Sequence, residues 1–189
     1  MIFQNLSNKE WSFLAKAVII SGATSVNSRL NGIEQEVVAF LTREQIEFEQ
    51  IKVRELPPED LIYGKFDSPE IAIANKKVES ADAVIVLTPV YKASFTGVLK
   101  TYLDLLPQKG LANKIILPLV IGGTFGHLLV IDYALKPVLS ALGATTILNG
   151  VYTLDTQVER IEDNQYELDS EAHERLQKAL TDLAEHLRK

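Results

Sequence analysis

The sequence predicts an α/β protein in which helices cover both faces of a parallel sheet. Five short apolar segments alternate with amphipathic segments of helical length, the pattern expected of repeated strand–helix units. The most central of these segments, Ala83 to Leu87 (AVIVL), has no polar alternation and so fits a strand covered on both faces. With 189 residues, 47% of them hydrophobic, the chain can bury one sizeable core. We therefore expect one domain over residues 1–189, a three-layer doubly wound sandwich with a five-stranded parallel sheet in the order 2-1-3-4-5.

The first half of the chain supplies two strands and two helices. Residues 17–21 (AVIIS) form the first buried strand, and a helix carrying Leu30, Ile33, Val37 and Leu41 on one side follows a polar loop. Residues 46–53 alternate between apolar and polar side chains, as expected of a strand nearer the sheet edge. A further helix is predicted to open at Ser68-Pro69, because proline is favoured at the first helical position.

The third strand is predicted to end at Pro89, which has no N–H for a ladder, and Ser94 is predicted to cap the helix that follows. The fourth strand spans residues 115–121. Because Pro118 lies inside it, we expect a bulge there.

The last third of the chain begins with a long helix predicted from Phe125 to Leu142. Its interior Pro137 removes one backbone hydrogen bond and should distort the preceding turn. Residues 147–154 form the fifth strand, and a polar stretch leads to a closing helix capped by Asp169 or Ser170.

Composition excludes several classes of function. The net charge is −6 and no basic cluster is present, so binding to nucleic acid or to an anionic membrane is not expected. Residues 1–15 form an N-terminal extension without the apolar core of a signal peptide, which predicts a cytoplasmic protein. No apolar run is long enough to span a bilayer.

No metal site is predicted either. The chain contains no cysteine, so thiolate ligands and nucleophiles are excluded and any redox chemistry needs a bound cofactor. His173 and His186 are too far apart on one helix to share a metal.

Ligands of doubly wound sheets bind beyond the carboxyl ends of the strands, where three loops are expected to converge. The loop after the first strand, ATSVNSR, carries hydroxyls at Thr24, Ser25 and Ser28 and a cation at Arg29, next to a helix start. These groups suit a phosphate monoester, although a hydroxyl-rich helix cap explains them as well. The spacing fits neither a Walker loop nor GxGxxG.

The other two loops, TPVYKAS and GGTFGH, suit a planar ligand. Tyr91 offers a ring for stacking, or serves simple loop packing. Gly122 and Gly123 allow a close approach of the backbone to such a ring.

Three longer segments resemble one family. They are PEDLIYGKFDSP (58–69), TPVYKASFTGVLKTYLDLLP (88–107) and GGTFGHLLVIDYALKPVLSALGA (122–144). Over residues 17–155 the chain resembles the flavodoxin-like NAD(P)H-dependent FMN reductases, and in particular the reductase component of two-component alkanesulfonate monooxygenases. The resemblance implies a flavodoxin-like fold with FMN and NADPH, or NADH, as ligands. It places Ser28 and Arg29 at the FMN phosphate, Pro89, Val90, Tyr91 and Lys92 along the flavin ring, and Gly122, Gly123 and Thr124 beside it.

The same resemblance places Tyr133 in a widened helix turn, at a subunit interface near the flavin, as a tentative catalytic residue. The distorted turn expected from Pro137 fits this placement. Apolar side chains surround most of the helix from Phe125 to Leu142, so one face of a sheet cannot bury them all. We therefore expect a homodimer or homotetramer.

One departure from the family concerns the start of the phosphate loop. The usual Gly-Ser-x-Arg is replaced by Gly22-Ala23-Thr24-Ser25, which lacks one hydroxyl and one cation. The change suits a reductase that takes FMN as a substrate and releases it, or a diverged flavin specificity.

The main hypothesis is an NAD(P)H-dependent FMN reductase that supplies reduced flavin to a partner monooxygenase. Two alternatives stay open. The first is an enzyme that keeps FMN bound and reduces a quinone, an azo compound or a metal oxyanion. The second is a flavodoxin-type electron carrier.

Overall fold

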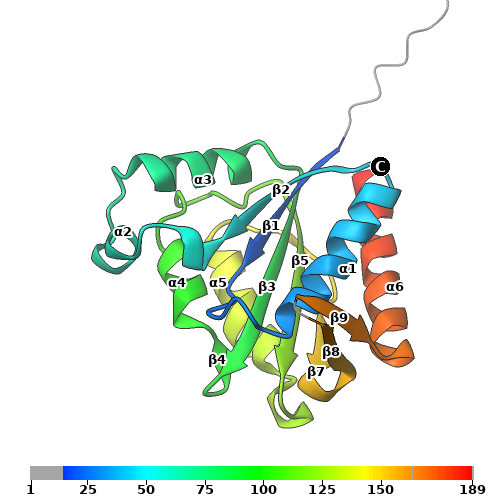
Figure 1. The fold of residues 1–189 in the computed structure, drawn as a ribbon. Coiled ribbons are helices and arrows are strands. Elements are labelled where there is room, and N and C mark those ends of the chain that lie inside the picture. Colours follow the sequence, from blue (N-terminus) through cyan, green and yellow to red (C-terminus); the bar gives the residue numbers. More distant parts are fainter. Residues whose placement is uncertain (1–14, 163, 189) are drawn as a thin grey trace, which may run out of the picture.

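A computed structural model describes residues 15–162 and 164–188 (Figure 1). The predicted N-terminal extension, residues 1–15, lies outside the described residues except for Ala15. A twisted sheet runs through the middle of the molecule, and helices cover both of its faces (Figure 1). The predicted doubly wound α/β architecture is therefore confirmed.

The main sheet has seven strands, along the path β2-β1-β3-β5-β6, with β4 attached to β3 and β7 attached to β5. All pairs are parallel except β3 with β4. A separate antiparallel pair is formed by β8 and β9. The strands are β1 Lys16–Ser21, β2 Glu47–Lys52, β3 Ala83–Tyr91, β4 Ser94–Phe95, β5 Ile115–Gly122, β6 Thr146–Ile147, β7 Val151–Leu154, β8 Val158–Glu162 and β9 Gln165–Leu168.

The five predicted strand segments lie in the predicted spatial order, but the prediction of five continuous strands is wrong. The fifth is broken into β6 and β7, which pair with the two ends of β5. The pairing with β5 continues as far as Leu148, whose N donates to Ile116 O at 2.8 Å. The break comes directly after this bond, opposite Pro118. Because Pro118 has no N–H, it cannot hold a continuous partner strand. The irregularity predicted at Pro118 lies on the partner side and not within β5, which stays in unbroken register with β3 from Ile115 to Ile121. Ile116 pairs with Ile147 but Leu119 pairs with Val151, so the segment opposite Pro118 has one extra residue.

Two hydrophobic cores lie on the two faces of the sheet. One face carries α1 and α6 with the β8–β9 hairpin, and the other carries α2, α3, α4 and α5 (Figure 1). The predicted start of α3 is confirmed, since the Ser68 hydroxyl accepts from Ile71 N. Asp169 likewise caps α6 by accepting from Ala172 N. The helices are α1 Leu30–Arg43, α2 Pro58–Tyr63, α3 Pro69–Glu79, α4 Gly97–Leu103, α5 Lys136–Ala141 and α6 Ser170–Leu187.

The segment predicted as one long helix from Phe125 to Leu142 has three parts. It starts with a 3-10 turn, η2 (Phe125–His127), continues into a π-helix, η3 (Ile131–Leu135), and ends as α5. Lys136 N donates to Ile131 O, five residues back, as a π turn requires. The prediction of one helix from Phe125 to Leu142 is thus wrong, whereas the predicted distortion of the turn before Pro137 is confirmed.

The β8–β9 hairpin was predicted only as a polar stretch. Val158 and Leu168 are buried in the core beside α1. A Cβ at Gly32 of α1 would lie 2.8 Å from both Val158 Cγ1 and Tyr166 Cβ. The absence of a side chain at Gly32 therefore allows the hairpin to pack on the helix.

Among the helices of the described residues, none combines the length and the apolar character that crossing a membrane requires.

Candidate functional site

Three loops lie together at the carboxyl ends of neighbouring strands. They follow β1 (residues 22–29), β3 (residues 92–93, within a hairpin) and β5 (residues 123–129). Because β3 pairs with both β1 and β5, all three loops emerge at one edge of the sheet. This arrangement brings the predicted phosphate loop next to the predicted ring-binding residues.

The first loop presents hydrogen-bond donors. Ser25 Oγ accepts from Asn27 N at 3.1 Å, and Ser28 Oγ accepts from Leu30 N at 3.2 Å. Each hydroxyl therefore keeps its own hydrogen for an anionic ligand. Within the described part of the chain, no acceptor is recorded for the amides of Thr24 and Val26. The loop can thus surround a phosphate with hydroxyl and amide donors.

Arg29 lies at the start of α1, directly after these hydroxyls. Its Nε donates to Val158 O at 3.0 Å, which ties the side chain to the start of β8. Among the described residues, no acidic side chain forms an ion pair with its two terminal nitrogens. Arg29 therefore has a structural contact in addition to its predicted role at a phosphate.

The second loop is a tight hairpin, so the prediction that the strand ends at Pro89 is wrong. Strand β3 continues to Tyr91, and Val90 pairs with Phe95 across the turn. Pairing with β1 ends at Leu87, so the missing N–H of Pro89 interrupts no bond on that side. Lys92 and Ala93 form the turn with φ of 50° and 62°, the geometry of a type I′ hairpin.

A buried threonine network fixes this hairpin against the first loop. Thr96 Oγ1 donates to Gly22 O at 2.8 Å, and Thr96 N donates to Thr88 Oγ1 at 3.1 Å. Thr96 Oγ1 also accepts from Leu99 N, so Thr96 caps α4 and the predicted cap at Ser94 is wrong. Sequence reasoning missed Thr96, although a threonine directly before Gly97 and an apolar run is a recognisable cap signal.

The first two loops also meet at the surface. Thr24 Oγ1 and the Tyr91 hydroxyl lie 3.1 Å apart. Tyr91 is still 52% exposed, so its ring is open to a ligand. Lys92 is exposed beside it, while Val90 is half-buried and Pro89 is buried.

Tyr152 of β7 supports the third loop. Its hydroxyl donates to Thr124 O at 2.7 Å, and Thr124 Oγ1 accepts from Gly126 N at 2.9 Å. Burial, together with the nearby Asp155 carboxylate, raises the pKa of Tyr152, which keeps the hydroxyl protonated as a donor. A Cβ at Gly122 would lie only 2.2 Å from this hydroxyl. Any side chain at position 122 would therefore clash with Tyr152. The sequence did not identify Tyr152 as a site residue.

Tyr133 projects from the π-helix and is 78% exposed. Leu128 and Leu129, just before the π-helix, are also exposed. The π-helix contacts β4, the returning strand of the hairpin. Tyr133 therefore lies on the element that packs against the candidate site, and it presents its ring to the outside.

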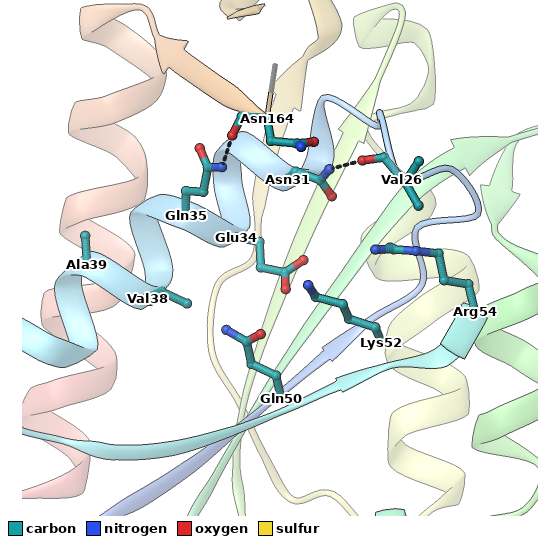
Figure 2. A pocket seen from close by; sticks show the side chains of 10 residues that line it. All are labelled: Val26, Asn31, Glu34, Gln35, Val38, Ala39, Gln50, Lys52, Arg54 and Asn164. Atoms are coloured by element: carbon teal, nitrogen blue, oxygen red, sulfur yellow. Dashed lines mark hydrogen bonds between the residues drawn. The ribbon is translucent and has the colours of Figure 1, made fainter. Parts of the chain in front are cut away.

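A cavity of about 550 Å³ lies beside the first loop, between α1 and β2 (Figure 2). Val26 of the loop lines it, but Ser25, Ser28 and Arg29 do not. Glu34 faces the cavity from α1, and this residue was also missed. The sequence feature that could have identified Glu34 is a carboxylate beside Ile33, on the apolar side of an amphipathic helix.

The three loops fit a ligand with a phosphate and a planar ring. Ser25, Ser28 and the loop amides offer donors at one end, and the Tyr91 ring and the open backbone at Gly123 lie at the other. FMN has this combination of groups. Among the described residues, no group of three or more His, Asp or Glu side chains gathers as a metal site would require.

Comparison with known sequences gives a consistent result. A sequence model of the family "NADPH-dependent FMN reductase" matches residues 15–159. A protein named FMN reductase (NADPH) from Pseudomonas putida strain KT2440 is 48% identical over 141 residues, which cover 75% of this chain and 72% of that protein. A protein of the same name from Escherichia coli K12 is 44% identical over 143 residues, 76% of this chain and 75% of that protein.

Solved structures support the fold. The apo form of the NADH:FMN oxidoreductase EMOB superposes with a TM-score of 0.78 at 32% identity, covering 92% of this chain and 88% of that one. An archaeal flavodoxin superposes with a TM-score of 0.59 at 11% identity, over 92% and 99% of the two chains, and this likeness concerns the fold alone. The predicted flavodoxin-like fold and the predicted class of oxidoreductase are both confirmed. The chain belongs to the NADPH-dependent FMN reductase family.

Proposed function

We propose that this protein transfers hydride from NADPH to FMN, takes FMN as an exchangeable substrate, and supplies reduced FMN to a partner monooxygenase. One observation carries the proposal. In a chain of this family, the Thr96 network holds the donor-rich first loop directly beside the β3–β4 hairpin. These hydrogen bonds fix the relative position of the two segments that the proposal assigns to FMN, which supports the proposal.

Ser25, Ser28 and Arg29 are proposed to hold the phosphate of FMN. The two hydroxyls have hydrogens left to donate, and the helix start adds amide donors and a favourable dipole. Arg29 adds a charge-assisted contact through its terminal nitrogens.

Pro89, Val90, Tyr91 and Lys92 are proposed to lie along the flavin ring, with Gly122, Gly123 and Thr124 at its other edge. When bound, FMN supplies the chemistry by accepting hydride at N5 from nicotinamide C4. The chain contributes position, because the hairpin is fixed by Thr96 and the third loop by Tyr152. No side chain is assigned as an obligatory acid or base.

Exchange of FMN is favoured by what the first loop lacks. The sequence Gly22-Ala23-Thr24-Ser25 has no cation of its own. Arg29 already uses its Nε to donate a hydrogen bond to Val158 O. Fewer charge-assisted contacts to the phosphate mean weaker retention of the flavin. Delivery to a monooxygenase is supported by the sequence resemblance to two-component reductases.

We also infer that the protein assembles as a homodimer or homotetramer through the segment around the π-helix. Its exposed apolar residues are Phe125, Leu128, Leu129 and Tyr133. Exposed apolar side chains gathered on one segment are typical of a protein interface. Because η3 contacts β4, assembly there would cover the candidate flavin site from outside.

Oxidation of NADPH and NADH, measured under low oxygen with increasing free FMN, tests the proposed function. A rate that saturates with added FMN supports the exchanging reductase. A full rate without added FMN would replace it with the enzyme that keeps its flavin, and the absence of oxidation would leave the electron carrier. NADPH giving the higher kcat/KM is the expected preference.

A further inference from the structure

The cavity between α1 and β2 has the composition of a binding site. Figure 2 shows Glu34 on α1 facing Lys52 and Arg54. Lys52 is the last residue of β2, and Arg54 lies in the turn that follows. Val38 adds an apolar wall, and the amide side chain of Gln50 lies at the far end. A few polar groups that converge in a partly apolar hollow are typical of small-molecule sites.

Two charged residues of this cavity, Glu34 and Arg54, have buried polar atoms without hydrogen-bond partners among the described residues. Glu34 is only 6% exposed, and its Oε2 has no hydrogen-bond partner within the described ranges. Arg54 Nε and Nη1 are buried and likewise unpartnered there, while Nη2 lies 3.4 Å from Glu55 Oε1. Leaving buried charged groups without hydrogen bonds is costly. A ligand that donates to the Glu34 carboxylate and accepts from the Arg54 guanidinium would satisfy these atoms.

A sugar phosphate satisfies both requirements. Its hydroxyls donate to a carboxylate, and its phosphate accepts charge-assisted bonds from a guanidinium and an ammonium. An isolated phosphate would leave the Glu34 carboxylate unsatisfied and close to a second anion. In Rossmann-type sheets an acidic side chain binds the ribose hydroxyl and a nearby arginine accommodates a 2′-phosphate, which shows that this pair of side chains suits an adenosine phosphate.

The position of the cavity connects it to the proposed FMN site. Val26 belongs to the first loop and also lines the cavity, and its carbonyl accepts from Asn31 Nδ2 at 2.7 Å. Asn31 lies in the first turn of α1, two residues after Arg29. A ligand that extends beyond a phosphate at the start of α1 would therefore reach the cavity directly.

We propose that this cavity binds the adenosine phosphate half of a dinucleotide. A ribose hydroxyl donates to Glu34, the phosphate accepts from Arg54 and Lys52, and adenine lies against Val38 with Gln50 at its edge. Two dinucleotides carry this chemistry, namely FAD through its AMP half and NADPH through its 2′-phosphorylated adenosine. The inference rests on the proposed function, since the dinucleotide is a substrate of the same reaction.

Calorimetric binding of AMP and of 2′,5′-ADP to the full chain tests the site without any turnover. The wild type should bind at least one of them, and Arg54→Gln and Lys52→Gln should each weaken binding about tenfold, the loss of roughly one charge-assisted bond. Lys76→Gln is the matched control, because Lys76 is exposed on α3, on the opposite face of the sheet. No binding by the wild type, or equal binding by the cavity variants, would overturn the proposal.

Glu34 is tested with a modified ligand, so that the result does not depend on the stability of one variant. The wild type should prefer the better-binding adenylate over its analogue without the ribose hydroxyls, and Glu34→Leu should abolish that preference. A preference that survives Glu34→Leu would remove Glu34 from the ribose site.

One binding comparison and one kinetic comparison distinguish the sources of the adenosine phosphate. If FAD is the source, the wild type binds FAD more tightly than FMN and Arg54→Gln removes the difference. If NADPH is the source, Arg54→Gln lowers the ratio of kcat/KM for NADPH to that for NADH. Adenylate binding with neither of these two effects of Arg54→Gln would contradict the proposal. Adenylate binding without any NADPH oxidation would instead refute only the proposed function.

Discussion

The hydroxyls of Thr24 and Tyr91 lie 3.1 Å apart and join two loops that are 67 residues apart in the sequence. Thr24 belongs to the proposed phosphate loop, and Tyr91 ends the strand along which the flavin ring is proposed to lie. The contact at the surface repeats the connection that Thr96 and Gly22 make in the interior. Both ends of the proposed FMN site are therefore positioned by bonds between the same two segments.

Tyr91 gives the first prediction. Tyr91→Phe keeps the ring and loses only an exposed hydrogen bond, so the KM for FMN should rise by no more than about threefold. Tyr91→Ala also loses the stacking surface and should raise this KM about tenfold. Steady-state NADPH oxidation with varied FMN measures both values. Equal effects of the two variants would show that the ring does not contact the flavin.

Arg29 is expected to distinguish flavins by their phosphate. Arg29→Ala should weaken FMN by about 1.5 to 3 kcal/mol, the value of a charge-assisted hydrogen bond, and should weaken riboflavin much less. Fluorescence titration with each flavin gives the comparison. Because Arg29 also donates to Val158 O, the unfolding midpoint of the variant must be measured alongside. Equal losses for both flavins would exclude Arg29 from the phosphate site.

Gly122 and Gly123 form a matched pair for stability. A Cβ at Gly122 would lie 2.2 Å from the Tyr152 hydroxyl, whereas the nearest atom to a Cβ at Gly123 is Asp155 Oδ2 at 3.7 Å. Gly122→Ala should therefore lower the free energy of unfolding by about 1 to 3 kcal/mol, as overpacking does. Gly123→Ala should change it little. Denaturant unfolding checks both, and two equally stable variants would show that Tyr152 does not confine the third loop.

The exposed apolar residues near the π-helix predict assembly. Size exclusion with light scattering should show a dimer or tetramer, and Leu129→Asp should shift the protein toward monomer because it places a charge in the interface. Ile73→Asp, at another exposed apolar residue, is the control. A monomeric wild type that still oxidises NADPH with FMN would contradict both the interface and its link to activity.

Much of the fold follows from local sequence patterns. The buried strands have apolar runs, α1 and α6 have regular apolar stripes, and Ser68-Pro69 has a recognisable cap. The distorted turn before Pro137 was predictable because a proline removes a definite hydrogen bond.

Most of the features that were missed depend on contacts between distant segments. The break between β6 and β7 reflects the missing N–H of Pro118 on the neighbouring strand. Asn149-Gly150 lies at the break and is a local turn signal that the prediction of one continuous strand did not use. The continuation of β3 past Pro89 depends on where β1 stops pairing.

Within the site, the loops were predictable but their fixed arrangement was not. Hydroxyls next to a helix start marked Ser25 and Ser28, and glycines marked the third loop. The roles of Thr96 and Tyr152 depend on bonds to Gly22 and Thr124, which the sequence alone cannot place. Family resemblance supplied the assignment of these loops to FMN.

The most direct test of the central claim is an anaerobic reaction of a small amount of protein with excess NADPH and a large molar excess of FMN. An exchanging reductase should bleach the yellow absorbance of nearly all the FMN, because each protein molecule reduces and releases many flavins. Bleaching that stops at one flavin per protein would contradict the claim.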